Sequence, residues 1–118
     1  MILKEHKKFL IIELKCAVLP QKVNGQNKLT KFKINKKFIY LISPKKIENN
    51  HFYLHLEKIF KLNKVVFFQL RLKKESINKK ITIGKKIQKI CKKYKVKLII
   101  NDDPFITKKI DADGCHLG

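Results

Sequence analysis

The sequence is poor in arginine and in acidic residues. Arg71 is the only arginine among 29 lysines and arginines, and aspartate and glutamate together number nine, which leaves a formal net charge of +20. Clustered lysine and arginine side chains bind the phosphate backbone of nucleic acids whatever the nucleotide sequence. The lysines are instead spread over the whole length, which favours a solvated surface with no specific nucleic-acid partner. A basic nucleic-acid-binding module stays open as an alternative.

The sequence also lacks several motifs that would assign a class directly. Its three cysteines, Cys16, Cys91 and Cys115, form no CxxC pair, so they are interpreted as buried free thiols of a reducing cytoplasm. The apolar run near residues 9–19 is interrupted by two charged residues, and we expect neither an export signal nor a membrane span. No GxGxxG or GxxxxGK[ST] pattern supports a nucleotide fold.

The chain is long enough for one domain with a core of its own, at 118 residues and 44% apolar content. Residues 1–37 contain no motif and are predicted to be an extension of unknown role, either a helix packed beneath the domain or a frayed segment. Residues 38–118 are predicted to form the domain itself.

From Phe38 onward the sequence alternates between strand and helix patterns. Apolar runs predict strands at 38–43, 65–73, 96–100 and 114–117, and helix starts are predicted at Asn49 or Asn50, Ser76 and Pro104. Strands that alternate with helices form right-handed βαβ units around a parallel sheet. The expected fold class is α/β, with about four parallel strands and covering helices.

The strand VVFFQLRLK, residues 65–73, passes from an apolar run into Gln69, Arg71 and Lys73. Because strand side chains alternate between faces, these three residues are predicted to share one face. An amide, a guanidinium and an ammonium in one row suit an anion, and lysine cannot reproduce the bidentate fork of the sole arginine. The alternative is an apolar strand that is simply followed by solvated bases.

A second polar group, Asn101 and Asp102, follows the next predicted strand. The carboxyl ends of parallel strands meet at the rim that carries the active site in parallel α/β folds. Asp102 is a candidate ligand of Mg²⁺, which prefers oxygen, and Asn101 a candidate amide contact for a substrate. An Asn-Asp turn before a helix is the alternative. The pattern identifies no catalytic residue.

The histidines carry less information. His51 and His55 lie one helical turn apart on a predicted helix, but no acidic or cysteine partner accompanies them, which favours surface residues over a zinc pair. His116 lies on the fourth predicted strand, in the core or at the rim.

Three segments, QLRLK, IINDD and ADGCHLG, resemble in order and spacing the first half of the thiamine phosphate synthase family. The resemblance runs from about Phe38 to Gly118. It implies a TIM-type (β/α)₈ barrel and a transferase of thiamine biosynthesis, which joins hydroxymethylpyrimidine diphosphate to thiazole phosphate with loss of pyrophosphate. It further implies that Gln69, Arg71, Lys73 and Asn101 bind the pyrimidine substrate and its diphosphate, and that Asp102 binds Mg²⁺.

The sequence departs from the family pattern in two places that matter. It stops at Gly118, where the family usually continues into glutamine and a second metal-binding aspartate, and Pro44 stands where aspartate is common. A related thiazole tautomerase shares the barrel but generally lacks the full polar set, so the synthase is favoured. We expect half a barrel with two unpaired sheet edges, incomplete as an enzyme and able to self-associate through those edges.

Overall fold

The computed structural model describes residues 2–6, 9–23 and 26–118, with side chains from Phe38 onward. Its elements in chain order are β1 Ile2–His6, β2 Phe9–Val23, β3 Gln26–Ile42, α1 His51–Phe60, β4 Val65–Leu70, α2 Ile77–Tyr94, β5 Lys97–Asn101, α3 Pro104–Lys109 and β6 Gly114–His116. No helix within the described ranges is long and apolar enough to cross a membrane.

The described strands form one sheet in the order β1-β2-β3-β4-β5-β6. β3, β4, β5 and β6 are parallel to one another, whereas β1, β2 and β3 pair antiparallel. The four parallel strands alternate with helices, as predicted. They correspond to part of a TIM-type barrel, in which eight such strands close on one another.

The N-terminal part of the chain matches neither of the two predictions for it, a helix packed beneath the domain or a frayed segment. The backbone there forms strands and not a helix, and β3 runs from Gln26 through to Ile42, across the expected boundary near residue 38. The outer edge of β3 is paired with β2, so the expectation of two unpaired edges was wrong for this one. Within the described residues, the sheet order leaves β6 as the edge of the parallel strands.

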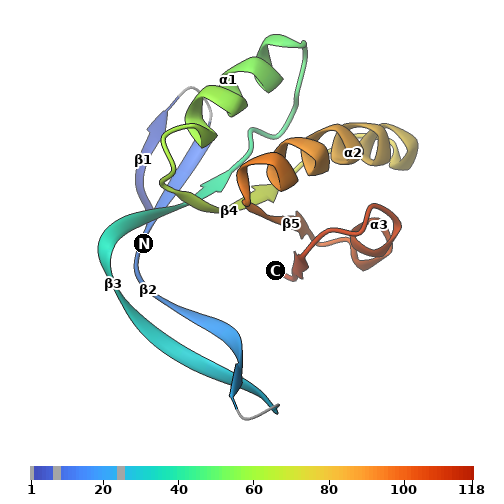
Figure 1. The fold of residues 1–118 in the computed structure, drawn as a ribbon. Helices are drawn as coiled ribbons and strands as arrows, with labels where there is room; N and C mark the ends of the chain where they lie inside the picture. Colours follow the sequence, from blue (N-terminus) through green and yellow to red (C-terminus); the bar gives the residue numbers. More distant parts are fainter. Residues whose placement is uncertain (1, 7–8, 24–25) are drawn as a thin grey trace.

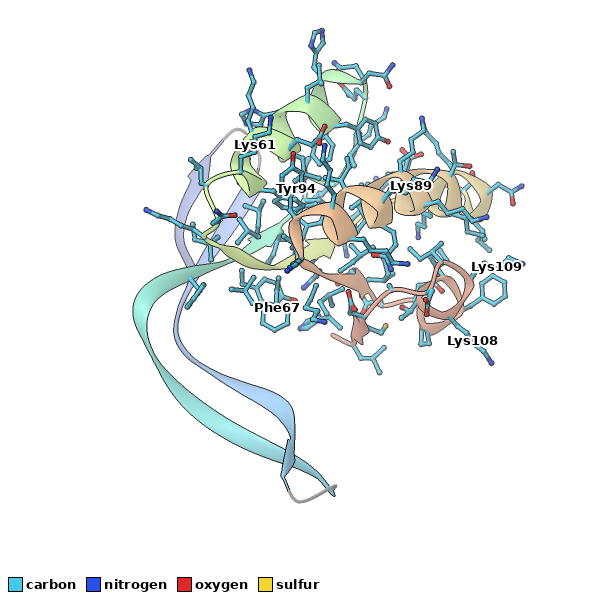
Figure 2. The ribbon with its side chains drawn as sticks, in the orientation of Figure 1. Lys61, Phe67, Lys89, Tyr94, Lys108 and Lys109 are labelled. Carbon is cyan, nitrogen blue, oxygen red and sulfur yellow. The ribbon has the colours of Figure 1, made fainter. Side chains whose placement is uncertain are left out.

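The hydrophobic core lies between the sheet and the helices α1 and α2, which cover one of its faces (Figure 1). Alternation along β4 sends Phe68 and Leu70 into this core, and Phe68 is fully buried with its ring 5.9 Å from that of Phe60. Phe67 points to the other side of the sheet, as Figure 2 shows. Leu70 therefore belongs to the helix-covered face and Phe67 to the opposite one.

Side-chain caps begin two of the helices where the sequence predicts them. The Ser76 hydroxyl accepts a hydrogen bond from the Lys79 backbone N–H at 3.2 Å, and the Asp103 carboxylate accepts one from Ile106 at 2.9 Å. Both bonds satisfy first-turn donors that have no partner within the helix. At the start of α1, Asn49 Oδ1 accepts from the His51 N–H at 3.0 Å.

The cysteines are only partly as expected. Cys91 is buried and its thiol is free, and burial raises its pKa to about 12, so it stays protonated and unreactive at neutral pH. Cys115 is also free but is only half-buried. The Cys16 side chain lies outside the part of the chain whose side chains are described.

Truncating Phe68 should destabilise the protein strongly. The change Phe68→Ala leaves a cavity between the sheet and α1, so the free energy of unfolding should fall by about 3–5 kcal/mol in a urea titration followed by circular dichroism. Leu62, which is 67% exposed, provides the control, because Leu62→Ala should change the same quantity by less than about 0.5 kcal/mol. Equal effects of the two changes would contradict the assignment of the core.

Candidate active site

Gln69 lies near the carboxyl end of β4 on the face that the helices do not cover. Its side chain is 4% exposed, and its Nε2 donates a hydrogen bond to the Tyr40 hydroxyl on β3 at 3.0 Å. The Tyr40 ring in turn stacks on Phe67, with the ring centroids 5.6 Å apart. These contacts hold the Gln69 amide in one orientation, with an aromatic surface beside it.

Arg71 follows β4 directly and is held through its backbone. Its N–H donates to the Ser43 hydroxyl at 2.8 Å, and that hydroxyl donates to the Pro44 carbonyl at 3.0 Å. The Nε of Arg71 is buried and makes no hydrogen bond to any described residue. A buried donor without a partner costs free energy, so the Arg71 Nε is an unsatisfied donor at the end of β4.

Lys73 is exposed, and its backbone continues the pairing of the two chain segments beyond the strands. Its N–H donates to the Lys45 carbonyl at 3.0 Å. Together with the bond from Arg71 to Ser43, this contact runs residues 71–73 alongside residues 43–45 at the rim. The backbone of Lys73 is therefore held in place, while its long side chain and ammonium group extend into solvent.

Asp102 follows β5 in a constrained backbone conformation. Its φ is 55°, in the left-handed region that aspartate tolerates better than most residues, and its N–H donates to the His116 carbonyl on β6 at 2.8 Å. Its Oδ1 accepts from the Gly118 N–H at 2.8 Å, and its Oδ2 accepts from Asn101 Nδ2 at 3.3 Å. Both carboxylate oxygens therefore have defined positions.

The pKa of Asp102, which follows β5, is influenced by Lys73, which follows β4. The Gly118 N–H lowers the pKa of this carboxyl, and the nearby positive charges of Lys73 and His116 lower the pKa further. The register also pairs Asn101 with His116. Lys73 follows β4 and Asp102 follows β5, at the ends of neighbouring parallel strands, and the charge of Lys73 contributes to the lowered pKa of Asp102.

Three of the four acidic residues between positions 102 and 113 do not contribute to this group. The Asp103 carboxylate caps α3, and Asp111 lies beyond that helix. The Asp113 carboxylate accepts a hydrogen bond from the Leu98 N–H at 2.8 Å, near the start of β5 and away from the rim. The clustering of carboxylates in the sequence is therefore dispersed by the fold, and Asp102 is the member that stays at the site.

The three histidines with described side chains differ in position and exposure. His51 is exposed, whereas His55 is half-buried, so only the first fits the expected surface position. His116 is exposed on β6 beside Asn101. Among the described residues, no three histidine, cysteine, aspartate or glutamate side chains come together in a way that could hold a metal ion.

Tyr40 and Ser43 belong to the site but were not singled out from the sequence. Each lies in or just after the apolar run 38–43, where a hydroxyl is easily taken for an ordinary strand residue. For Tyr40 the available signal was the strand period, which puts residues 40 and 42 on the face opposite to residue 41, as it puts Phe67 and Gln69 opposite to Phe68. The period gives no such signal for Ser43. Only the pairing of β3 with β4 shows which of them meets which polar partner.

Two hollows lie at opposite ends of the parallel strands in the described part of the chain. One of about 10 Å³ lies at the rim between β4, β5, α2 and α3, room for no more than about one water molecule. A wider one of about 460 Å³ lies where α2 ends and β5 begins, at the opposite end of the sheet. Neither of these two hollows is lined by Gln69, Arg71, Lys73 or Asp102.

These observations define an α/β protein of the parallel-barrel class, with polar and charged side chains at the carboxyl ends of its strands. The family described as thiamine monophosphate synthase (TMP-TENI) matches residues 39–118, and the chain belongs to this family. This agrees with the resemblance seen in its sequence.

Two of its relatives show how much of a synthase the chain covers. It is 62% identical over 86 residues to the thiamine-phosphate synthase of Pelagibacter ubique (strain HTCC1062), which is 73% of this chain and 42% of the relative. It is 38% identical over 81 residues to that of Campylobacter jejuni subsp. jejuni, which is 68% of this chain and 38% of the relative. The chain thus spans about two fifths of the length of these relatives.

The Asp102 carboxyl should titrate at a lower pH than an ordinary aspartate. Because its pKa in the folded state is lowered, ionised Asp102 stabilises the fold at neutral pH, and this contribution is lost as the pH falls through the folded-state pKa. Carboxyl chemical shifts measured by NMR against pH would give the value. Lys73→Gln should raise the pKa, whereas Lys89→Gln on the outer side of α2 should leave it unchanged; equal effects would show that Lys73 does not act locally.

Proposed function

We propose that this chain forms part of a thiamine-phosphate synthase, a transferase that joins hydroxymethylpyrimidine diphosphate to thiazole phosphate and releases pyrophosphate. The observation that carries the proposal is the Arg71 guanidinium, which has a buried Nε without a partner among the described residues and lies in the same rim as Lys73 and Asp102. The names of the two relatives supply the reaction. We also infer a cytoplasmic location, as the resemblance to this family implies.

Each rim residue has a role that follows from its chemistry. Arg71 offers a bidentate fork to diphosphate oxygens and Lys73 a mobile point charge. Gln69, oriented by Tyr40, and Asn101 present amides that match the ring nitrogens and amino group of a pyrimidine. The stacked rings of Tyr40 and Phe67 provide an apolar surface beside them.

Asp102 fits part of a magnesium site. It is an ionised carboxylate at the rim, and Mg²⁺ is commonly held by one or two carboxylates together with substrate phosphate oxygens. Such an ion would neutralise charge on the diphosphate. A single carboxylate is too few oxygens to hold the ion alone, so we expect residues 1–118 to bind Mg²⁺ weakly without diphosphate.

The positive charges of Arg71 and Lys73 favour cleavage of the bond between the pyrimidine methylene carbon and the diphosphate oxygen. When the diphosphate leaves, the electron pair of its carbon–oxygen bond goes with it, and the methylene carbon of the pyrimidine becomes cationic. The thiazole nitrogen then donates its lone pair to that carbon and forms the new carbon–nitrogen bond. Arg71 and Lys73 stabilise the negative charge that develops on the departing group, which is the usual contribution of fixed cations at such a site.

Replacing Arg71 by lysine should weaken diphosphate binding while keeping the charge. The protein for this test is a completed chain, defined as residues 1–118 continued by the C-terminal part of the Pelagibacter ubique synthase. Loss of the bidentate contact should cost about 1.5–3 kcal/mol of pyrophosphate binding free energy in isothermal titration with Mg²⁺ present. Equal affinities of the two proteins would exclude Arg71 as the diphosphate ligand.

Two further variants of the completed chain separate local binding from general charge. Lys89→Gln removes a surface cation from α2 (Figure 2) and should leave pyrophosphate affinity close to that of the unmodified chain at physiological salt. Asp102→Asn should remove most of the gain in affinity that Mg²⁺ provides. An unchanged dependence on Mg²⁺ in Asp102→Asn would show that the ion is held elsewhere.

The nucleic-acid alternative is distinguished by specificity and not by binding as such. A protein with 29 basic residues will retain DNA at low salt through its charge alone. We expect hydroxymethylpyrimidine diphosphate to raise the melting temperature of the completed chain at physiological salt, and no nucleic acid to be selected by sequence or structure. A strong preference for one nucleic acid, with no thermal shift by the diphosphate, would favour the binding module.

A further inference from the structure

The outer edge of β3 is the part of the parallel sheet whose pairing differs from that of a closed barrel. On one side β3 pairs with β4, and on the other residues 10–14 of β2 pair with residues 38–42 in antiparallel register. In a closed (β/α)₈ barrel, every strand has a parallel neighbour on both sides. The antiparallel β2 therefore occupies backbone donors and acceptors that a closing strand would need.

The pairing between β2 and β3 is divided into two blocks. In the proximal block Leu10–Leu14 pairs with Phe38–Ile42, and in the distal block Cys16–Val23 pairs with Gln26–Lys33. Between the blocks lies a single residue on β2 but four residues, 34–37, on β3. Figure 1 shows the distal part of this hairpin projecting away from the helices and from the parallel strands.

This division allows one block to open without the other. The unpaired residues 34–37 of β3, three more than the single residue opposite them on β2, interrupt the ladder, so the hydrogen bonds of the two blocks are not continuous. The proximal block lies along the domain, whereas the distal block projects away from it (Figure 1). Residues 34–37 can therefore act as the hinge between them.

We propose that residues 10–14 of β2 are a removable cover for the β3 edge, displaced when a further parallel strand of a barrel of this family takes that edge. The proposal rests on the proposed function, because it assumes that the remaining strands of a synthase barrel join this chain. A similar number of backbone hydrogen bonds is made before and after the exchange. While it is in place, the cover protects β3 from pairing with other chains.

Disulfide trapping tests the exchange directly. In a Cys16→Ser, Cys115→Ser background, the proximal pair Leu14→Cys with Phe38→Cys and the distal pair Leu19→Cys with Thr30→Cys both join residues that lie opposite one another. Both disulfides should form in residues 1–118 on mild oxidation. In the completed chain the distal disulfide should still form and the proximal one should be lost, as read from the mobility of the non-reduced protein.

Each other outcome of this trapping experiment has a definite meaning. A proximal disulfide that forms as fully in the completed chain as in residues 1–118 overturns the proposal, as does its failure to form in residues 1–118. If the cross-linking follows expectation but the completed chain makes no thiamine phosphate from its two substrates, the proposed function fails and the exchange stands. If the completed chain makes thiamine phosphate but retains the proximal disulfide, the proposed function stands and the exchange fails.

A second measurement uses residues 1–118 alone and does not depend on how the completed chain folds. Successive amides of a strand point to opposite edges, so Ile11→Pro and Ile12→Pro are made in parallel, and one of them removes a donor from the proximal block. That variant should self-associate more than the unmodified protein in analytical ultracentrifugation. The matched changes Ala17→Pro and Val18→Pro in the distal block should not, and unchanged association in both proximal variants would overturn the protective role.

Discussion

The parallel pairing of β4 between β3 and β5 is the constraint on which the rest of the structure depends. It presents one face of β4, with Phe68 and Leu70, to the helices and the other face, with Phe67 and Gln69, away from them. Because side chains alternate strictly, the burial of Phe68 also decides where Gln69 points. The core and the candidate site are thus two consequences of one register.

The rim keeps this order beyond the last strand residues because backbone and side-chain bonds continue there. Arg71 is fixed to the Ser43 hydroxyl, Lys73 to the Lys45 carbonyl and Asp102 to the His116 carbonyl. Each bond joins segments from neighbouring strands, so the functional side chains inherit the spacing of the sheet. The Gly118 N–H lowers the pKa of Asp102, and the charges of Lys73 and His116 lower it further.

Much of this arrangement could be predicted from local patterns. The apolar runs predicted β4 and β5, the caps at Ser76 and Asp103 lie where polar residues precede amphipathic segments, and the polar residues after two strands predicted a rim. The prediction failed where a residue's role depends on a distant partner. Both edges of the parallel strands were expected to be unpaired, yet residues 10–14 of β2 pair with the outer edge of β3.

From Phe38 onward, the sequence by itself determined the order of strands and helices, their approximate ends and the residue types at the ends of the strands, because period, capping and turn chemistry act over a few neighbouring residues. Only the tertiary structure decided that Tyr40 orients Gln69, that the Arg71 Nε is buried without a partner in the described chain, and that β2 covers the edge of β3. These features depend on pairing between segments far apart in sequence. The free energy of such pairing is shared by both partners, so the pattern of either segment alone does not reveal it.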